Sequence, residues 1–250
     1  MRTFLIYIIL LTLSIYGCRS QERKLKRIDK ELQFVKTKLD GVNREYAFYS
    51  PYKPISNSPK IPLVLLLHGR FGTVSQVLED NELLALAKKD KFFLLVPGGY
   101  SRSWADGRGT SPADKDKIND VRFIETLIIN VSEKYNIDQK NIFITGHSNG
   151  GFMSHRMLLE RTGLFKAGVI VAAHLSKSQL ENFKPKQPVS IAFMLGTKDP
   201  LIPYEGGFIP KGAEILGGEE TVQKWVNWNE CGPESNLEAF DKEKDETKLE

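Results

Sequence analysis

The chain has 250 residues, of which 41% are hydrophobic and 26% charged, as is typical of one sizeable soluble globular domain. A net charge of +4, with lysine and arginine scattered along the chain, excludes the basic stripe that a nucleic-acid partner needs. No internal repeat is visible.

The N-terminus has the pattern of an export signal. Arg2 precedes an apolar run, FLIYIILLTLSIYG, which is too short for a transmembrane span and is typical of a signal peptide. Cys18 follows directly and resembles the cysteine of a bacterial lipobox, so we expect residues 1–17 to be removed and Cys18 to be lipidated. The alternatives are an ordinary signal peptide with an incidental cysteine, or an uncleaved anchor. With Cys18 lipidated, Cys231 has no disulfide partner in this chain.

Residues 18–44 are polar and basic and are expected to be a tether between the lipid and the domain. The sequence thus predicts an exported protein held at the cell envelope by its lipid, or secreted if Cys18 is unmodified. The domain itself is expected to span residues 45–250.

The domain alternates apolar strands with helices. Continuous apolar runs are typical of strands buried on both faces, and their alternation with helical periodicity predicts a mostly parallel α/β sheet. Strands are expected at 44–51, 62–69, 92–99, 141–146, 166–173 and 188–196, and helices at 75–90, 119–135, 151–162 and 219–232. The stretch 97–118 is rich in Gly, Ser and Asp and is expected to be an active-site loop.

Ser148 lies in ITGHSNGG, between an expected buried strand and the helix after it. Together with Gly146 and Gly150 it forms the G-x-S-x-G arrangement of a serine nucleophile. Glycine is needed there because the turn is tight and the strand and helix pass close together. The alternative is a serine that only caps a buried helix.

A second turn, LLLHGRFG, follows another expected buried strand. A backbone N–H just after such a His-Gly pair, together with the N–H that follows the nucleophile, is suited to bind a developing oxyanion. Those donors would be Arg70 and Asn149, whereas His68 is expected to pack under the loop. The alternative is a plain strand-to-helix turn that uses Gly69 and Gly72.

The acid partner is expected from MLGTKDPLIPYEGG. Asp199 follows the strand at 188–196, at the sheet edge where active sites of parallel sheets gather. The alternative is an ordinary turn aspartate. Weaker candidates for the acid are Asp106, Asp120 and Glu205.

The stretches LHGRFGT, SWADGRGTSPADKDKINDVRFIETLI, IFITGHSNGGFMSHRM, GTKDPLIPYEGG and TVQKWVNWNECG resemble the polyhydroxybutyrate depolymerase and feruloyl or acetylxylan esterase group of α/β-hydrolases. The resemblance covers about residues 45–232 and implies a secreted or envelope serine esterase with the α/β-hydrolase fold. It implies Ser148 as nucleophile, Asp199 as acid, and the amides of Arg70 and Asn149 as oxyanion donors. No metal or cofactor is expected.

The resemblance also implies residues that contact the substrate. Trp104 would lie in the loop that lines the acyl or aromatic pocket. His147, beside the nucleophile, is expected at the substrate and not as the base.

The sequence departs from the family pattern at the general base. The family continues past the NECG cysteine with further strands, a Gly-Gly-His loop that carries the catalytic histidine, and a final helix, whereas this sequence ends at FDKEKDETKLE. No histidine follows Asp199, so we expect the last strand and the histidine loop to be missing and the chain to be a poor catalyst. The alternative is a substitute base, with His174 ahead of His155 because it follows the strand next to the nucleophile strand.

Three functions remain open from the sequence. The first is a serine carboxylic-ester hydrolase that acts through an acyl-enzyme on polyhydroxybutyrate, feruloyl or acetyl esters, including polymeric ones. The second is a non-catalytic relative that binds such substrates, and the third is a serine peptidase of the same superfold. The oligomeric state is left open.

Overall fold

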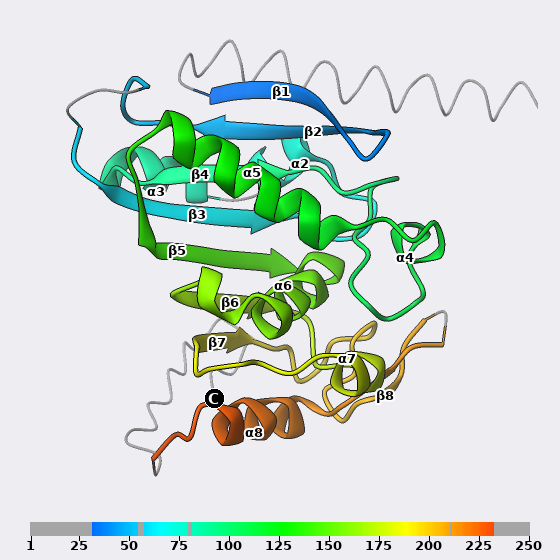
Figure 1. Cartoon of the computed structure of the whole chain (residues 1–250). Helices are drawn as coiled ribbons and strands as arrows, with labels where there is room; N and C mark the ends of the chain where they lie inside the picture. The colour runs from blue at the N-terminus through cyan, green and yellow to red at the C-terminus, as the bar shows by residue number, and fades with distance from the viewer. Residues whose placement is uncertain (1–31, 55–57, 80–81, 211, 233–250) are drawn as a thin grey trace, which may run out of the picture.

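The computed structural model describes residues 32–54, 58–79, 82–210 and 212–232. A seven-stranded sheet runs through this part of the chain in the order β1-β2-β4-β3-β5-β6-β7 (Figure 1). The pairs β1–β2 and β2–β4 are antiparallel, and the other four pairs are parallel. The strands are β1 (Leu32–Leu39), β2 (Val42–Tyr49), β3 (Ile61–Leu67), β4 (Phe93–Pro97), β5 (Ile137–His147), β6 (Ala167–Val171) and β7 (Ser190–Met194). The predicted mostly parallel α/β sheet is confirmed.

The first hairpin corrects the predicted boundary of the domain. Residues 32–44, expected to belong to the tether, form β1 and the start of β2, which pair from Leu32↔Tyr49 to Leu39↔Val42. The two residues between the strands, Asp40 and Gly41, have φ values of 49° and 81°. An Asp-Gly pair of this kind suits a two-residue hairpin turn, and this short-range signal outweighs the basic composition. The predicted signal peptide, Cys18 and the first part of the tether lie outside the described residues.

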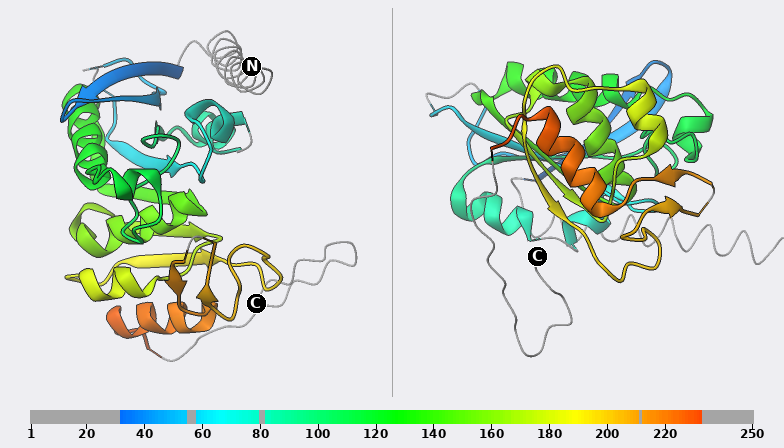
Figure 2. Two further views of the ribbon diagram at one scale, coloured as in Figure 1. Left: turned by 90° about the vertical axis from the view of Figure 1, so that its right-hand side faces the viewer. Right: turned by 90° about the horizontal axis from the view of Figure 1, so that it is seen from below.

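Two helical layers cover the sheet on opposite faces (Figures 1 and 2). Apolar side chains of α5 (Asp120–Lys134), α6 (Asn149–Glu160) and α8 (Gly218–Trp228) pack in one core cluster with one face of β3 and β5. Side chains of α2 (Val74–Glu79) and α3 (Leu83–Asp90) pack in a second cluster with the other face of β3 and β4. All five residues of β4 are buried, as its continuous apolar run predicts.

The segment 75–90, expected to be one helix, forms the two helices α2 and α3. Residues 80–82 separate them in the sequence, and of these Asp80 and Asn81 lie outside the described residues.

Short elements complete the described chain. They are α4 (Pro112–Lys115), the 3₁₀ helix η1 (Thr162–Leu164), α7 (Lys177–Asn182), β8 (Gly207–Phe208) and β9 (Glu214–Ile215). In the described ranges, no helix is both long enough and apolar enough to cross a bilayer. Cys231 is a free, exposed cysteine.

Candidate active site

Ser148 occupies the sharp turn between β5 and α6, as predicted. Its φ and ψ are 53° and −118°, outside the conformations that non-glycine residues favour. Its backbone N–H donates to the carbonyl of Val171 on the neighbouring strand at 2.9 Å, which fixes the turn against the sheet. A Cβ at Gly146 would overlap the main chain of Gly150, and one at Gly150 would overlap the main chain of Leu67. These close approaches are the physical reason for the two glycines around Ser148.

The loop after β3 lies directly against this turn. A Cβ built on Gly69 would stand 3.7 Å from Cβ of Ser148 and 3.1 Å from Nδ1 of His147. The loop is held by a bond from the Gly72 N–H to the carbonyl of Gly69 at 3.0 Å, and by one from the Phe71 N–H to the carbonyl of Arg102 at 2.8 Å. The amide of Arg70 follows Gly69, and the amide of Asn149 opens α6. Both predicted oxyanion donors therefore belong to segments that border Ser148.

The side chain of Asn149 is buried and anchors the active-site loop to α6. Its Oδ1 accepts a hydrogen bond from the Trp104 N–H at 2.8 Å, and its Nδ2 donates to the Trp104 carbonyl at 3.2 Å and to the Asp106 carboxylate. Asp106 is also fully buried and forms a 2.6 Å ion pair with Arg108, whose guanidinium lies 3.5 Å from the ring centroid of Phe152 on α6. The loop at 97–118, predicted only as an active-site loop, thus contains the groups that hold the first turn of α6.

Trp104 does not have the predicted role at the substrate. Its side chain is completely buried, and its indole N–H donates to the carbonyl of His68 at 2.8 Å. The indole ring lies against the imidazole of His68, with 5.1 Å between the ring centroids. Because the ring presents no accessible surface, the expectation that Trp104 lines the pocket is corrected: it packs beneath the loop.

Asp199 lies in the loop after β7, the second strand beyond the nucleophile strand. Its Oδ1 accepts from the N–H groups of Leu201 and Ile202 at 2.8 and 3.0 Å, and its own N–H donates to the carbonyl of Gly196 at 3.2 Å. The carboxylate is partly exposed, and the structure gives Oδ2 no such bond. Asp199 therefore has one oxygen fixed by the turn and a second oxygen available to a partner.

The weaker acid candidates are placed differently. Asp106 and Asp120 are fully buried and paired with Arg108 and Arg44 respectively. Burial raises the pKa of Asp120, and the Arg44 guanidinium opposes that rise. Glu205 is exposed. Asp106 and Asp120 thus stabilise the packing of the active-site loop and of the sheet.

His68 and His155 are locked in the interior. Nε2 of His68 accepts from the Gly99 N–H at 2.9 Å, its Nδ1 lies 2.7 Å from the carbonyl of Gly69, and burial lowers its pKa to about 4. Nδ1 of His155 accepts from the indole N–H of Trp225 at 3.3 Å, and burial lowers its pKa to about 3. Both rings are therefore neutral at physiological pH, and His68 packs under the loop as predicted.

The other two histidines lie closer to the reaction site. His147 is the last residue of β5, is exposed, and lines a cavity beside Ser148. His174 is buried, with Nδ1 at 2.9 Å from the carbonyl of Leu216 and its ring edge-on to Tyr204. Burial lowers the pKa of His174, and the carboxylate of Asp199 opposes this effect. None of the four histidines has a carboxylate on one ring nitrogen and Ser148 on the other in the bonds that the structure gives.

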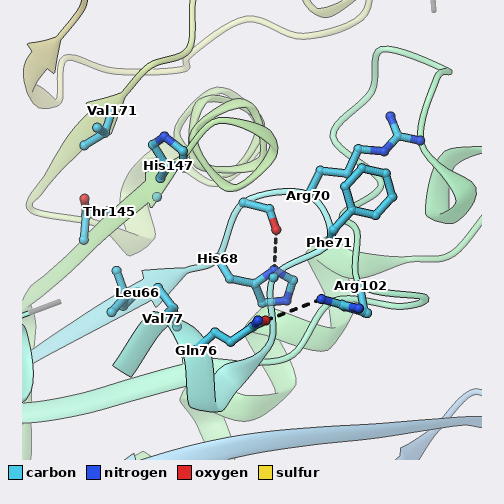
Figure 3. A pocket seen from close by; sticks show the side chains of 13 residues that line it. Leu66, His68, Arg70, Phe71, Gln76, Val77, Arg102, Thr145, His147 and Val171 are labelled. Atoms are coloured by element: carbon cyan, nitrogen blue, oxygen red, sulfur yellow. Dashed lines mark hydrogen bonds between the residues drawn. The ribbon is translucent and has the colours of Figure 1, made fainter. Parts of the chain in front are cut away.

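A cavity of about 660 Å³ lies at the carboxyl ends of β3 and β5 (Figure 3). Its wall includes His147 and Gly69, which border Ser148, but Ser148 is not itself a lining residue. Apolar side chains of Leu66, Val77 and Val171 form part of its wall. The loop residues from His68 to Gly72, together with Arg102 and His147, form the rest of its rim. Its size suits a small-molecule ligand or the acyl end of a larger one.

The sheet order, the Ser148 turn and the loop after β3 define the chain as an α/β-hydrolase. Residues 97–185, which include the Ser148 turn, match the model of the prolyl oligopeptidase family. A thermostable esterase whose crystal structure is known superposes with a TM-score of 0.58 at 22% identity, over 80% of this chain and 52% of that one.

Several proteins described as esterases are similar to this chain in sequence. A protein described as a probable feruloyl esterase C of Aspergillus niger is 26% identical over 198 residues, which cover 77% of this chain and 64% of that protein. Feruloyl esterase B of Piromyces equi is 27% identical over 180 residues, which cover 68% of this chain and 33% of that protein. The chain thus spans less than two thirds of the length of these relatives. It has the α/β-hydrolase fold and is similar in sequence to proteins described as esterases.

Proposed function

We propose that this chain is a serine carboxylic-ester hydrolase with the α/β-hydrolase fold, in which Ser148 is the nucleophile. The observation that carries the proposal is the positive φ of Ser148 at the end of β5, in a turn that only glycine neighbours allow. A strained backbone at the carboxyl end of a central strand is typical of a functional residue, because a residue with a purely structural role would relax it.

The reaction would follow from the arrangement around Ser148. Its hydroxyl oxygen attacks the ester carbonyl carbon and forms a tetrahedral intermediate, whose oxyanion would accept hydrogen bonds from the amides of Arg70 and Asn149. The alcohol leaves with a proton, and water then releases the acid from the acyl-enzyme. The proton of the Ser148 hydroxyl must pass to a base and then to the leaving alcohol. Asp199 would orient such a base through the carboxylate oxygen that the turn leaves available, but in the described structure no histidine is bonded to it.

The substrate class is proposed from the relatives. The proteins that match this chain include a feruloyl esterase of Piromyces equi and a bifunctional acetylxylan esterase/xylanase of Neocallimastix patriciarum. We therefore propose feruloyl and acetyl esters of polysaccharides as substrates, with polyhydroxybutyrate as a further polymeric candidate. His147, exposed on the rim of the cavity, is the proposed substrate contact.

The location of the protein is a separate proposal. We propose export and lipidation at Cys18, on the strength of the short apolar run before that cysteine. Cys18→Ala is expected to release the protein from the membrane fraction or to block its processing. Unchanged fractionation and unchanged mass of the mature protein would rule lipidation out.

The test of the enzyme proposal compares wild type with Ser148→Ala. Wild type should be labelled at Ser148 by a fluorophosphonate probe and should release product from methyl ferulate or 4-nitrophenyl acetate, both slowly because no histidine is bonded to Ser148, and Ser148→Ala should do neither. Peptide 4-nitroanilides test the second candidate, a serine peptidase, which the prolyl oligopeptidase match favours. Binding of these esters without labelling or turnover would instead indicate a non-catalytic relative.

A further inference from the structure

The cavity beside Ser148 carries positive charge that nothing in its wall balances. Thirteen residues line it, and they include Arg70 and Arg102 but neither aspartate nor glutamate. In Figure 3 the loop after β3 and the 102 turn lie on one side of the cavity and His147 lies on the other. The Arg102 side chain extends toward Gln76, whereas the Arg70 guanidinium lies beyond the Phe71 ring and points away from His147. The wall at Gly69 is the part that lies against Ser148.

The hydrogen bonds of Arg102 leave most of its donors unused. Its Nη2 donates to Oε1 of the half-buried Gln76 at 3.4 Å, which is a long, solvent-exposed bond to a neutral acceptor (Figure 3). In the described part of the chain, the structure gives this guanidinium no carboxylate partner. The backbone is strained here as well, because Ser101 and Arg102 have φ values of 46° and 56°. The backbone carbonyl of Arg102 accepts a hydrogen bond from the N–H of Phe71, and this bond holds Arg102 against the loop beside the nucleophile.

Arg70 also has hydrogen-bond donors without acceptors, and its side chain is less exposed than that of Arg102. Its Nε is buried without an acceptor, and its Nη2 reaches the carbonyl of Thr110 only at 3.5 Å. A buried donor without a partner is unfavourable, more so on a charged group. The Arg102 guanidinium, with unused donors at the cavity, favours a ligand with acceptor oxygens and negative charge, because its planar fork matches a carboxylate. Arg70 adds a second positive charge at the rim.

We propose that this cavity is an anion subsite, and that the esters the chain takes carry a free carboxylate beside the scissile bond, recognised by Arg102 and Arg70. That the ligand is an ester rests on the proposed esterase function, whereas binding of an anion in this cavity does not require turnover. The carboxylate would sit on the acid or the alcohol portion of the substrate, so both are tested below.

The first experiment compares matched pairs of esters that differ by one charge. 4-Acetoxybenzoate and 4-acetoxybenzamide place the charge on the alcohol side, and monomethyl terephthalate and methyl 4-carbamoylbenzoate place it on the acyl side. The para geometry prevents the carboxylate from attacking its own ester. We expect wild type to prefer the charged member of at least one pair by about fivefold in kcat/KM, and the preference to shrink at 1 M salt.

Three variants locate the effect. Arg102→Gln and Arg70→Gln keep the backbone amides and remove one charge each, and both should lower the preference toward unity. Arg122→Gln removes one charge from the exposed face of α5, where Arg122 pairs with Asp40 at 3.1 Å, and should leave the preference unchanged. An equal loss in all three variants would show a general charge effect and would overturn the subsite.

A binding measurement separates this inference from the esterase proposal. Calorimetric titration of the same four esters into Ser148→Ala should give tighter binding of a carboxylate than of its amide, and the Ser148→Ala, Arg102→Gln double variant should lose that difference. Equal affinity for carboxylate and amide in Ser148→Ala overturns the subsite, even if the neutral esters are hydrolysed. Arginine-dependent binding without Ser148-dependent hydrolysis would retain the subsite and refute the esterase.

Discussion

Asn149 and Trp104 are joined by two hydrogen bonds, from the Trp104 N–H to Oδ1 of Asn149 at 2.8 Å and from Nδ2 of Asn149 to the Trp104 carbonyl at 3.2 Å. Both side chains are buried, so neither bond has a competing water. Because Asn149 directly follows Ser148, this pair connects the active-site loop to the turn that carries the nucleophile. The amide of Asn149 is a proposed oxyanion donor, and its position therefore depends on the loop.

Asn149→Ala is expected to lower the free energy of unfolding by about 3 kcal/mol, because the buried N–H of Trp104 and the carboxylate of Asp106 each lose a partner. Urea denaturation measures the change. Asn182→Ala is the matched control, since Asn182 is exposed and bonds only the Ser178 carbonyl through Nδ2, so its effect should stay within about 0.5 kcal/mol. Equal effects of the two substitutions would refute the anchoring role.

Ser148→Gly is expected to raise the free energy of unfolding by about 1 kcal/mol, although it removes the nucleophile. Glycine relieves the cost of a φ of 53°, and this gain exceeds the extra entropy that glycine loses on folding. The control is Ser154→Gly in the interior of α6, where helical geometry makes glycine unfavourable by about 1 kcal/mol. A loss of stability in Ser148→Gly equal to that in Ser154→Gly would show that the turn stores no strain.

The strands and the nucleophile turn could be predicted from the sequence because their signals are local. The apolar runs of β3 and β4 and the glycines around Ser148 depend on neighbouring residues alone. The roles of Trp104 and Asn149 depend on contacts 45 residues apart in the chain, which no local pattern encodes. The same holds for Arg44, whose ion pair with Asp120 spans 76 residues and lies in a segment that composition assigned to a tether. The Asp40-Gly41 pair is a local signal for that hairpin, but the basic composition of the flanking residues favours the prediction of a tether.

Acid should destabilise the fold through His68 and His155. Burial lowers the pKa of His68 to about 4 and that of His155 to about 3, below the ordinary value of 6.5. Between each folded pKa and pH 6.5, the unfolded chain therefore binds more protons than the folded chain. The stability is complete above pH 6.5 and is lost as the pH falls toward 4 and 3. At pH 5 the loss should be about 2 kcal/mol for each histidine relative to pH 7.5.

The measurement is urea denaturation at both pH values. His68→Gln should reduce the difference between them by about 2 kcal/mol, while Asn182→Gln, which removes no titratable group from the exposed end of α7, should keep the wild-type difference. A wild-type stability that does not change between pH 7.5 and 5 would contradict neutral burial of these rings.

His174→Gln is expected to lower stability but to leave the rate of ester cleavage within about twofold of wild type. A histidine base needs its Nδ1–H directed at a carboxylate, whereas Nδ1 of His174 lies on the main-chain carbonyl of Leu216. Replacing the ring removes that bond and leaves a cavity in a buried site, which affects folding more than chemistry. A rate loss of 10²-fold or more in His174→Gln, with folding intact, would instead identify it as the base.

Added imidazole should accelerate the cleavage of methyl ferulate by wild type, and not by Ser148→Ala. The reason is the arrangement of the four histidines: His68 and His155 are buried and neutral, His174 is bound to Leu216, and His147 ends β5 on the rim of the cavity. An attacking hydroxyl without a positioned base loses about 10²–10⁴-fold, and a diffusible base that enters the 660 Å³ cavity should restore part of that loss. Methyl ferulate is used because imidazole itself attacks activated aryl esters. Rapid turnover by wild type with no response to imidazole would show that one of these histidines reorients to serve Ser148, and the single His147→Gln and His174→Gln variants would then show which.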